Sequence, residues 1–268
     1  AVEFGTTNTH IEYKVGEQIR PFEIDLHDQQ TASLHQSSSQ VAVQLINTII
    51  PHEFLPDKIK AGTTFSFPQR TNISYSKSND LMGSTISLAD LNIAFVYGKQ
   101  KTKLNAAIDT NLKWSRFNLD EGELTKVQAF LEQLIFLMRN KVLLNNGRLD
   151  KTKLIWFFPS SMSSVNVGHL DSIWKNLFQN YFGGSNIDSR VYSMSESIAP
   201  FYHFKETSIV NAAHHLAANI DIGGGTSDFV IYKANKPALS TSCKFAANSL
   251  FGGTYERNGF VQRFYPKF

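Results

Sequence analysis

The sequence predicts an α/β protein in which a mixed sheet is flanked by helices and followed by the start of a second, similar half. Two observations lead to this fold class. A glycine-containing strand–turn–strand motif occurs near residue 5 and again near residue 223, and between the copies short apolar runs alternate with segments of helical apolar spacing. Alternating strands and helices are typical of a sheet covered by helices.

The repeated motif reads "VEFGTTNTHIEYK" at residues 2–14 and "IDIGGGTSDFVIYK" at residues 220–233. Both copies run through an apolar residue, an acid, an apolar residue, glycine, a small polar turn and an apolar strand, so Glu3 corresponds to Asp221. Two hairpins can share such a composition by chance. As a true repeat, the motif predicts two related halves that each present a phosphate-binding turn.

Three consecutive glycines, Gly223, Gly224 and Gly225, interrupt the second copy. Glycine weakens a strand because it loses more backbone entropy on folding than other residues and packs no side chain. The run therefore indicates a need for bare backbone, either for positive φ or for close approach of a phosphate to N–H groups. A plain hairpin turn is the alternative. The flanking Asp221 and Asp228 favour the phosphate, with Mg²⁺ between the negative charges.

Two segments between the copies predict core-facing helices, and three others predict strands. The run "KLIWFFP" at residues 153–159 indicates a strand buried on both faces. "KVGEQIRPFEI" supplies a further strand, and residues 189–204 predict a strand, a polar turn at 193–197 and a helix. The helices have apolar residues at helical spacing, namely Val127, Phe130, Leu131, Leu134, Ile135, Met138 and Val142 in the first and Leu170, Ile173, Trp174, Leu177, Phe178 and Tyr181 in the second.

Composition argues against several classes of function. A net charge of +3 without a dense basic stripe gives no reason to expect a nucleic-acid partner. Cys243 is the sole cysteine, which excludes an intrachain disulfide and a cysteine zinc site. No run of 18 apolar residues and no signal-peptide pattern occurs, so we expect a cytoplasmic protein without a membrane partner. His214 and His215 have no third metal ligand at a useful spacing.

The pair "EFGTTNT" and "DIGGGTSD", with "ESIAPFYHF" between them, resembles the actin-like ATPase superfamily of actin, seventy-kilodalton heat-shock chaperones and sugar kinases. It is most similar to the chaperones, whose loops read Asp-Leu-Gly-Thr-Thr and Asp-Leu-Gly-Gly-Gly-Thr-Phe-Asp. The resemblance is weak in residues 33–108 and good in 154–264. It implies a ribonuclease H-like, actin-type ATPase fold with a mixed five-stranded sheet. Residues 1–216 would form the first half, and residues 217–268 the incomplete start of the second.

Carried over by motif, the resemblance implies that ATP or ADP binds with Mg²⁺ between the two turns. The acids Asp221, Asp228 and Glu3 would arrange the water shell of Mg²⁺. Glu196 would position or polarise the attacking water, Lys113 would face the γ-phosphate, and Glu3 is a third candidate catalytic residue. The β- and γ-phosphates would be held by Gly5, Thr6, Thr7 and Asn8 on one side and by Gly223, Gly224, Gly225 and Thr226 on the other.

Simpler interpretations of these residues stay open from the sequence. Asp221 and Asp228 could cap turns, because aspartate side chains bond to nearby backbone. Glu196 could be an ordinary acid at a helix N-terminus. Lys113 could be a solvated surface lysine.

The function expected from the resemblance is an ATP-binding domain of a chaperone-like or actin-like ATPase. It would hydrolyse ATP with Mg²⁺ to open and close a cleft, acting on a protein client or a filament partner. Glu3 departs from the family's aspartate, so a non-hydrolysing nucleotide-sensing scaffold is one alternative, and a sugar or acetate kinase is another. The chain begins without Met and ends soon after the second motif, so we expect a fragment.

Overall fold

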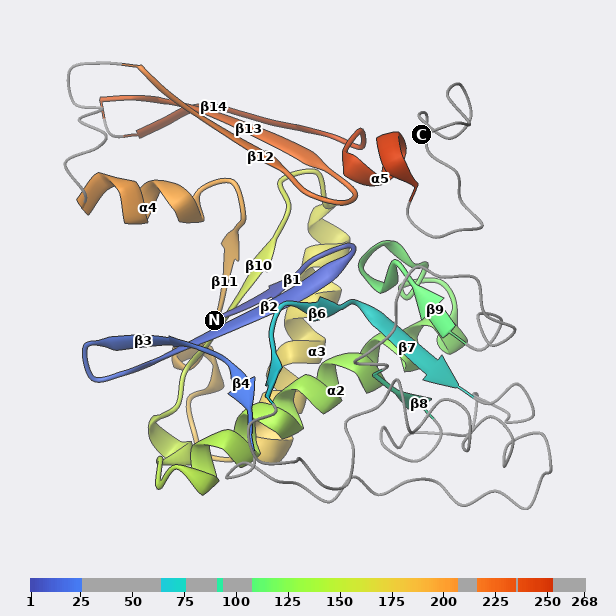
Figure 1. Ribbon diagram of the computed structural model, residues 1–268, viewed down its shortest axis with the longest axis vertical. Coiled ribbons are helices and arrows are strands. Elements are labelled where there is room, and N and C mark those ends of the chain that lie inside the picture. The colour runs from blue at the N-terminus through green and yellow to red at the C-terminus, as the bar shows by residue number, and fades with distance from the viewer. Residues whose placement is uncertain (26–63, 76–90, 94–107, 207–215, 235, 253–268) are drawn as a thin grey trace.

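The computed structural model describes residues 1–25, 64–75, 91–93, 108–206, 216–234 and 236–252. His214, His215 and the "LFGGTYERNGF" stretch beyond residue 252 lie outside these residues. Within them, a larger mixed sheet packs with two long helices, and a second, three-stranded sheet lies beside it (Figure 1). No helix in the described ranges is both long enough and apolar enough to span a bilayer.

The larger sheet is mixed, as the sequence predicts. Its strand order is β11-β10-β1-β2-β3, with parallel pairing of β1 with β10 and of β10 with β11, and antiparallel pairing elsewhere. A sixth strand, β6, pairs with β2 outside this row of five. The strands are β1 (Val2–Phe4), β2 (Asn8–Val15), β3 (Gln18–Pro21), β6 (Gln69–Arg70), β10 (Leu154–Phe158) and β11 (Val191–Ser195).

The second repeated motif forms an antiparallel sheet of its own, made of β12 (Ala217–Ile222), β13 (Ser227–Lys233) and β14 (Lys236–Cys243). Helix α4 (Ala199–Glu206) precedes this sheet and packs on it, because the ring of Phe201 stacks on Tyr232 at 4.0 Å. Helix α5 (Ala247–Phe251) follows it. The remaining strands are β4 (Glu23–Ile24), β5 (Phe65–Ser66), β7 (Asn72–Tyr75), β8 (Leu91–Asn92) and β9 (Ile108–Thr110).

Both predicted helices are present and contribute to one apolar core with β1, β2, β10 and β11. Helix α2 (Glu121–Leu144) begins at Asp120, whose side chain accepts a hydrogen bond from the backbone N–H of Glu123. Helix α3 (Ser164–Phe182) begins at Ser163 in the same way and ends at Gly183, where φ is 62°. The apolar spacing matters because it places one stripe of each helix against the sheet.

Two details differ from the sequence-based expectation. Strand β10 is not buried on both faces: Leu154 and Trp156 are buried, whereas Ile155 and Phe157 are only partly covered, because α2 and α3 pack on one side of the sheet. The predicted polar turn at 193–197 begins later, since β11 continues to Ser195 through its pairing with β10.

A buried arginine fixes the starts of β10 and β11. Arg190 donates hydrogen bonds to the carbonyls of Leu149, Thr152 and Gly183, and its guanidinium lies 4.9 Å from the centre of the Phe178 ring. The side chain thereby ties two short 3-10 helices, η4 (Leu149–Lys151) and η5 (Ile187–Ser189), to the end of α3.

We expect Arg190→Met to lower the free energy of unfolding by about 3 kcal/mol, because three carbonyls lose a charged donor at once. Arg190→Lys keeps the charge but lacks the planar fork, so its loss should be intermediate. Urea unfolding of the three proteins measures the effect. Equal midpoints for Arg190→Met and wild type would contradict this account.

Candidate functional site

The turns of the two repeated motifs meet at one pocket of about 460 Å³. Of the predicted site residues, Gly225 is the one that does not line the pocket. Four further lining residues were not predicted from the sequence, namely Arg70, Ile222, Ala247 and Asn248. The predicted residues that do line it are Glu3, Gly5, Thr6, Thr7, Asn8, Lys113, Glu196, Asp221, Gly223, Gly224, Thr226 and Asp228.

The glycines allow the two turns to approach each other closely. A Cβ atom on Gly224 would lie 2.0 Å from Thr7 Oγ1, and one on Gly225 would lie 2.6 Å from Thr6 Oγ1. Neither glycine has a positive φ. Gly224 and Gly225 are thus required by the side chains of the opposite turn, rather than by an unusual backbone conformation, whereas a Cβ atom on Gly223 would lie 3.3 Å from the carbonyl oxygen of Thr226 in its own turn.

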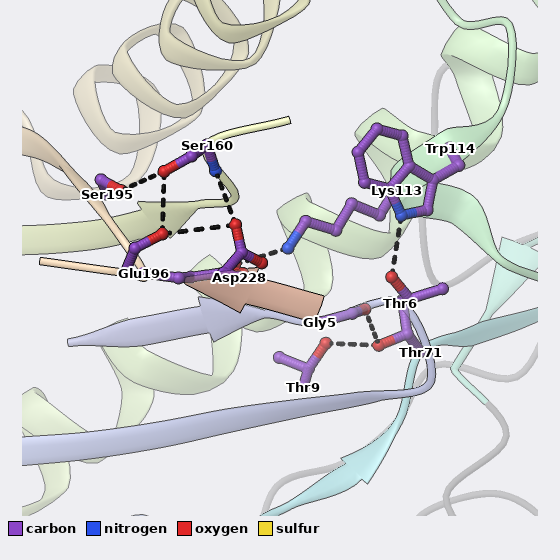
Figure 2. A network of polar contacts seen from close by, with 11 residues as sticks. Gly5, Thr6, Thr9, Thr71, Lys113, Trp114, Ser160, Ser195, Glu196 and Asp228 are labelled. Carbon is purple, nitrogen blue, oxygen red and sulfur yellow. Dashed lines mark hydrogen bonds and ion pairs between the residues drawn. The ribbon is translucent and has the colours of Figure 1, made fainter. Parts of the chain in front are cut away.

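Two hydrogen bonds reach the threonines of the first turn from outside it. Trp114 Nε1 donates to Thr6 Oγ1 at 2.8 Å (Figure 2), and Asn248 Nδ2 donates to Thr7 Oγ1 at 2.9 Å. Asn248 belongs to α5, and its own backbone N–H donates to the carbonyl of Gly224 at 2.9 Å. Asn248 therefore holds both turns at once.

Thr71 supports the same turn from behind. Its hydroxyl donates to the carbonyl of Gly5 at 2.7 Å and lies 2.9 Å from the hydroxyl of Thr9 (Figure 2). Its backbone N–H donates to the carbonyl of Thr7. Thr9 and Thr71 are buried. The first turn is thus held by Thr71, which lies between β6 and β7.

Lys113 and Glu196 form a buried ion pair at the pocket. Lys113 Nζ lies 2.5 Å from Glu196 Oε1, and their side chains are 3% and 12% exposed. This burial excludes the solvated-lysine interpretation. Lys113 is placed by the 3-10 helix η3 (Leu112–Trp114), and Glu196 directly follows β11. Burial raises the pKa of Glu196, and the attraction of Lys113 only partly opposes that shift.

Asp228 connects the second sheet to the first. It is 2% exposed, and its Oδ1 accepts hydrogen bonds from the N–H of Ser160 and the hydroxyl of Ser197, each at 3.3 Å (Figure 2). The hydroxyls of Ser160 and Ser197 lie 2.8 Å apart. Because Ser160 follows β10 and Ser197 follows β11, Asp228 is tied to the ends of two neighbouring strands.

Negative charge exceeds positive charge in the pocket. Desolvation raises the pKa of Glu3, and the nearby Asp221 raises it further, against the opposing effect of Lys113. Desolvation and the carboxylate of Asp228, its partner across β12 and β13, raise the pKa of Asp221. The ionisable lining residues are Glu3, Glu196, Asp221, Asp228, Lys113 and Arg70.

No group of three or more His, Cys, Asp or Glu side chains in the described part of the chain is arranged to coordinate a metal directly. The roles assigned to Glu3, Asp221 and Asp228 around Mg²⁺ therefore stay predictions.

Three residues at or beside the pocket were not predicted from the sequence, namely Arg70, Trp114 and Asn248. Arg70 lines the pocket because β6 pairs with β2 at Asn8. No sequence pattern near Arg70 predicts that pairing. Trp114 is adjacent to Lys113 in the sequence, but this position does not predict the hydrogen bond from its indole to Thr6 in the first turn. Asn248 lies just before "LFGG", the segment whose resemblance to the family was noticed for its glycines.

No protein-family model matches this sequence, and no curated protein matches it. Solved structures do match its fold. MreB 5 of Spiroplasma citri bound to AMPPNP has a TM-score of 0.50 at 12% identity, covering 98% of this chain and 56% of that one. MreB5 of Spiroplasma citri bound to ADP has a TM-score of 0.45 at 15% identity, covering 76% and 54%.

A third match is an exopolyphosphatase of Cytophaga hutchinsonii ATCC 33406, with a TM-score of 0.35 at 9% identity, covering 91% of this chain and 49% of that one. The chain therefore spans about half the length of the structures it matches. The AMPPNP-bound match shows that the chain has the actin-like ATPase fold, as the two turns predict.

The contact between the turns predicts that Gly224→Ala is destabilising, by roughly 1–3 kcal/mol, because the new methyl group collides with Thr7. Gly168→Ala is the matched control: it lies inside α3 with open space around its Cα, so it should be neutral or stabilising. Thermal or urea unfolding checks both. Equal effects at the two positions would show that the turns are not in contact.

The raised pKa of Asp221 predicts that Asp221→Asn stabilises the protein at neutral pH. The charged form is disfavoured in the folded state, so wild type loses stability as pH rises from the ordinary value of 3.8 through the raised one. The gain from the substitution should therefore be present at pH 7 and vanish below about pH 4. Unfolding curves across this range test it, and a gain independent of pH would contradict the electrostatic cause.

Proposed function

We propose that the pocket between the two turns binds ATP with Mg²⁺ and hydrolyses it, and that binding and hydrolysis change how far the two turns close on each other. The observation that carries the proposal is the meeting of two glycine turns over the buried Lys113–Glu196 pair, in a chain with the actin-like ATPase fold. The bound AMPPNP of the MreB 5 structure with a TM-score of 0.50 supports a nucleoside triphosphate as the ligand.

The pocket suits a phosphate chain in size and in chemistry. Its volume of about 460 Å³ is within the range of small-molecule sites. Thr6 and Thr7 of one turn and Gly224 and Thr226 of the other line the same pocket, which supports the proposal that both turns contact the β- and γ-phosphates. Turn backbone and hydroxyl groups are the donors that phosphate oxygens accept.

The charge of the pocket supports Mg²⁺ as the companion of the nucleotide. Four carboxylates already face two cations, and a triphosphate adds further negative charge. Asp228 Oδ1 accepts hydrogen bonds from Ser160 and Ser197, so we propose Asp221 and Glu3 as the main carboxylates that bind waters of the ion, with Asp228 contributing through its other oxygen. When bound, Mg²⁺ would neutralise phosphate charge and orient the transferred group.

Glu196 and Lys113 would carry the hydrolytic step. The ion pair holds the Glu196 carboxylate at the pocket wall, where it can accept a hydrogen bond from a water and orient it toward the terminal phosphorus. Lys113 would stabilise the negative charge that develops on the phosphate oxygens. As in other phosphoryl transfers, catalysis would come mainly from positioning the attacking water and from stabilising negative charge on the phosphate oxygens.

Movement between the sheets is proposed because the same contacts define the pocket and join its two sides. The second sheet is attached at Asp228 and through Asn248 to Thr7. A ligand bound in the pocket would alter these contacts. Ligand binding would therefore change how closely the second sheet approaches the first. A protein client or a filament partner for this cycle stays a prediction.

Titration calorimetry of Mg·AMPPNP and Mg·ADP into the full-length protein, with phosphate release from Mg·ATP followed in parallel, tests the proposal. We expect both nucleotides to bind, more weakly when Mg²⁺ is replaced by a chelator, and phosphate to be released slowly. Binding without release would favour the nucleotide-sensing scaffold. Absence of binding would overturn the proposal.

Glu196→Gln should leave the Kd for Mg·AMPPNP within about threefold and lower the turnover number by roughly 100-fold or more, because the amide orients water poorly and accepts no proton. Glu17→Gln, at a surface residue with a 97% exposed side chain, is the matched control. Glu196→Asp keeps the charge beside Lys113 and checks that loss of activity is not loss of folding. Unchanged turnover in Glu196→Gln would remove Glu196 from the mechanism.

A further inference from the structure

Trp114 contacts the first turn and the segment that follows β14, and it has no role in the function proposed so far. Its indole Nε1 donates to Thr6 Oγ1 at 2.8 Å in the first turn, and the Nζ of Lys244 lies 4.8 Å from the centre of its ring (Figure 2 shows the first contact). Lys244 belongs to the segment between β14 and α5, so the indole joins the first turn to the second sheet.

The hydrogen bond fixes the role of the Thr6 hydroxyl. An indole N–H can only donate, so Thr6 Oγ1 must be the acceptor in this bond. The hydroxyl proton is not used in this bond, and within the described residues the Thr6 hydroxyl donates no hydrogen bond to another group. Thr6 lines the pocket. Its proton is therefore free for an anion bound there, and a phosphate oxygen is an acceptor of the required kind.

The second threonine of the turn is arranged in the same way. Asn248 Nδ2 donates to Thr7 Oγ1 at 2.9 Å. The oxygen of Thr7 is again the acceptor, so its O–H group can donate to another partner. Both donors are linked to the chain that follows β14: Asn248 is part of α5, and the ring of Trp114 is in contact with the ammonium of Lys244, which directly follows β14. A cation over an aromatic face is an attractive contact that helps to hold the ring in place.

We propose that Trp114 is a positioning residue that orients the Thr6 hydroxyl as a hydrogen-bond donor to the bound phosphate, and that Lys244 holds the indole in this orientation from the second sheet. The inference rests on the proposed function. It adds that the phosphate affinity of the first turn depends on a residue outside both turns.

A double-mutant cycle on the full-length protein tests the inference, with the Kd for Mg·AMPPNP measured by calorimetry. Thr6→Val removes the hydroxyl at nearly constant shape and should weaken binding roughly tenfold, whereas Thr6→Ser should stay near wild type. Trp114→Phe keeps an aromatic ring but removes the N–H, and should weaken binding about three- to tenfold. If Trp114 acts through Thr6, the double variant should bind within about twofold of Thr6→Val alone.

Trp156→Phe is the matched control, because Trp156 Nε1 also makes a side-chain hydrogen bond, to Asp171 Oδ1 at 3.3 Å, away from the pocket. It should change thermal stability without changing the Kd. Lys244→Gln tests the second contact in a variant that leaves the core intact, against Lys236→Gln on the exposed strand β14. We expect weaker binding for Lys244→Gln and none of that effect for Lys236→Gln.

The outcomes separate this inference from the proposed function. Failure of the wild-type protein to bind nucleotide would overturn both. Wild-type binding with an unchanged Kd in Trp114→Phe and Lys244→Gln, or fully additive effects of Trp114→Phe and Thr6→Val, would overturn the inference alone.

Discussion

The close approach of the two glycine turns is the constraint on which the rest of this structure depends. Gly224 and Gly225 lie against Thr7 and Thr6 at distances that leave no room for a Cβ atom. With the turns this close, side chains from otherwise separate sheets converge on one pocket, and hydrogen bonds such as that from Asn248 to Thr7 can cross between them. The lack of side chains at Gly224 and Gly225 therefore allows the two turns to come together and form the pocket.

The pocket is electrostatically unfavourable on its own. Burial and mutual repulsion raise the pKa of Glu3, Glu196 and Asp221, and Lys113 only partly offsets this. Such an arrangement costs folding free energy, which is common where charged groups are kept for binding or chemistry. The remaining carboxylate, Asp228, accepts hydrogen bonds from residues that follow β10 and β11.

The residues that support the first turn also contact the second turn or the segment that follows β14. Asn248 contacts both turns, and Trp114 has Thr6 on one side and the Lys244 ammonium on the other. A change in the position of the second sheet would thus alter the donors presented by the first turn. The reverse holds by thermodynamic necessity, since a ligand that prefers one arrangement of the sheets must favour that arrangement.

The sequence by itself determined the local elements and the chemical character of the two turns. Apolar spacing was enough for α2 and α3 because a helix repeats its buried face within a few residues, and the glycines and acids of the turns are adjacent in the chain. Only the tertiary structure decided that Lys113 pairs with Glu196, 83 residues away, and that Asp228 is held by Ser160, 68 residues away. Local patterns carry no information on such partners, because the sheet order that brings them together is set by packing over the whole core.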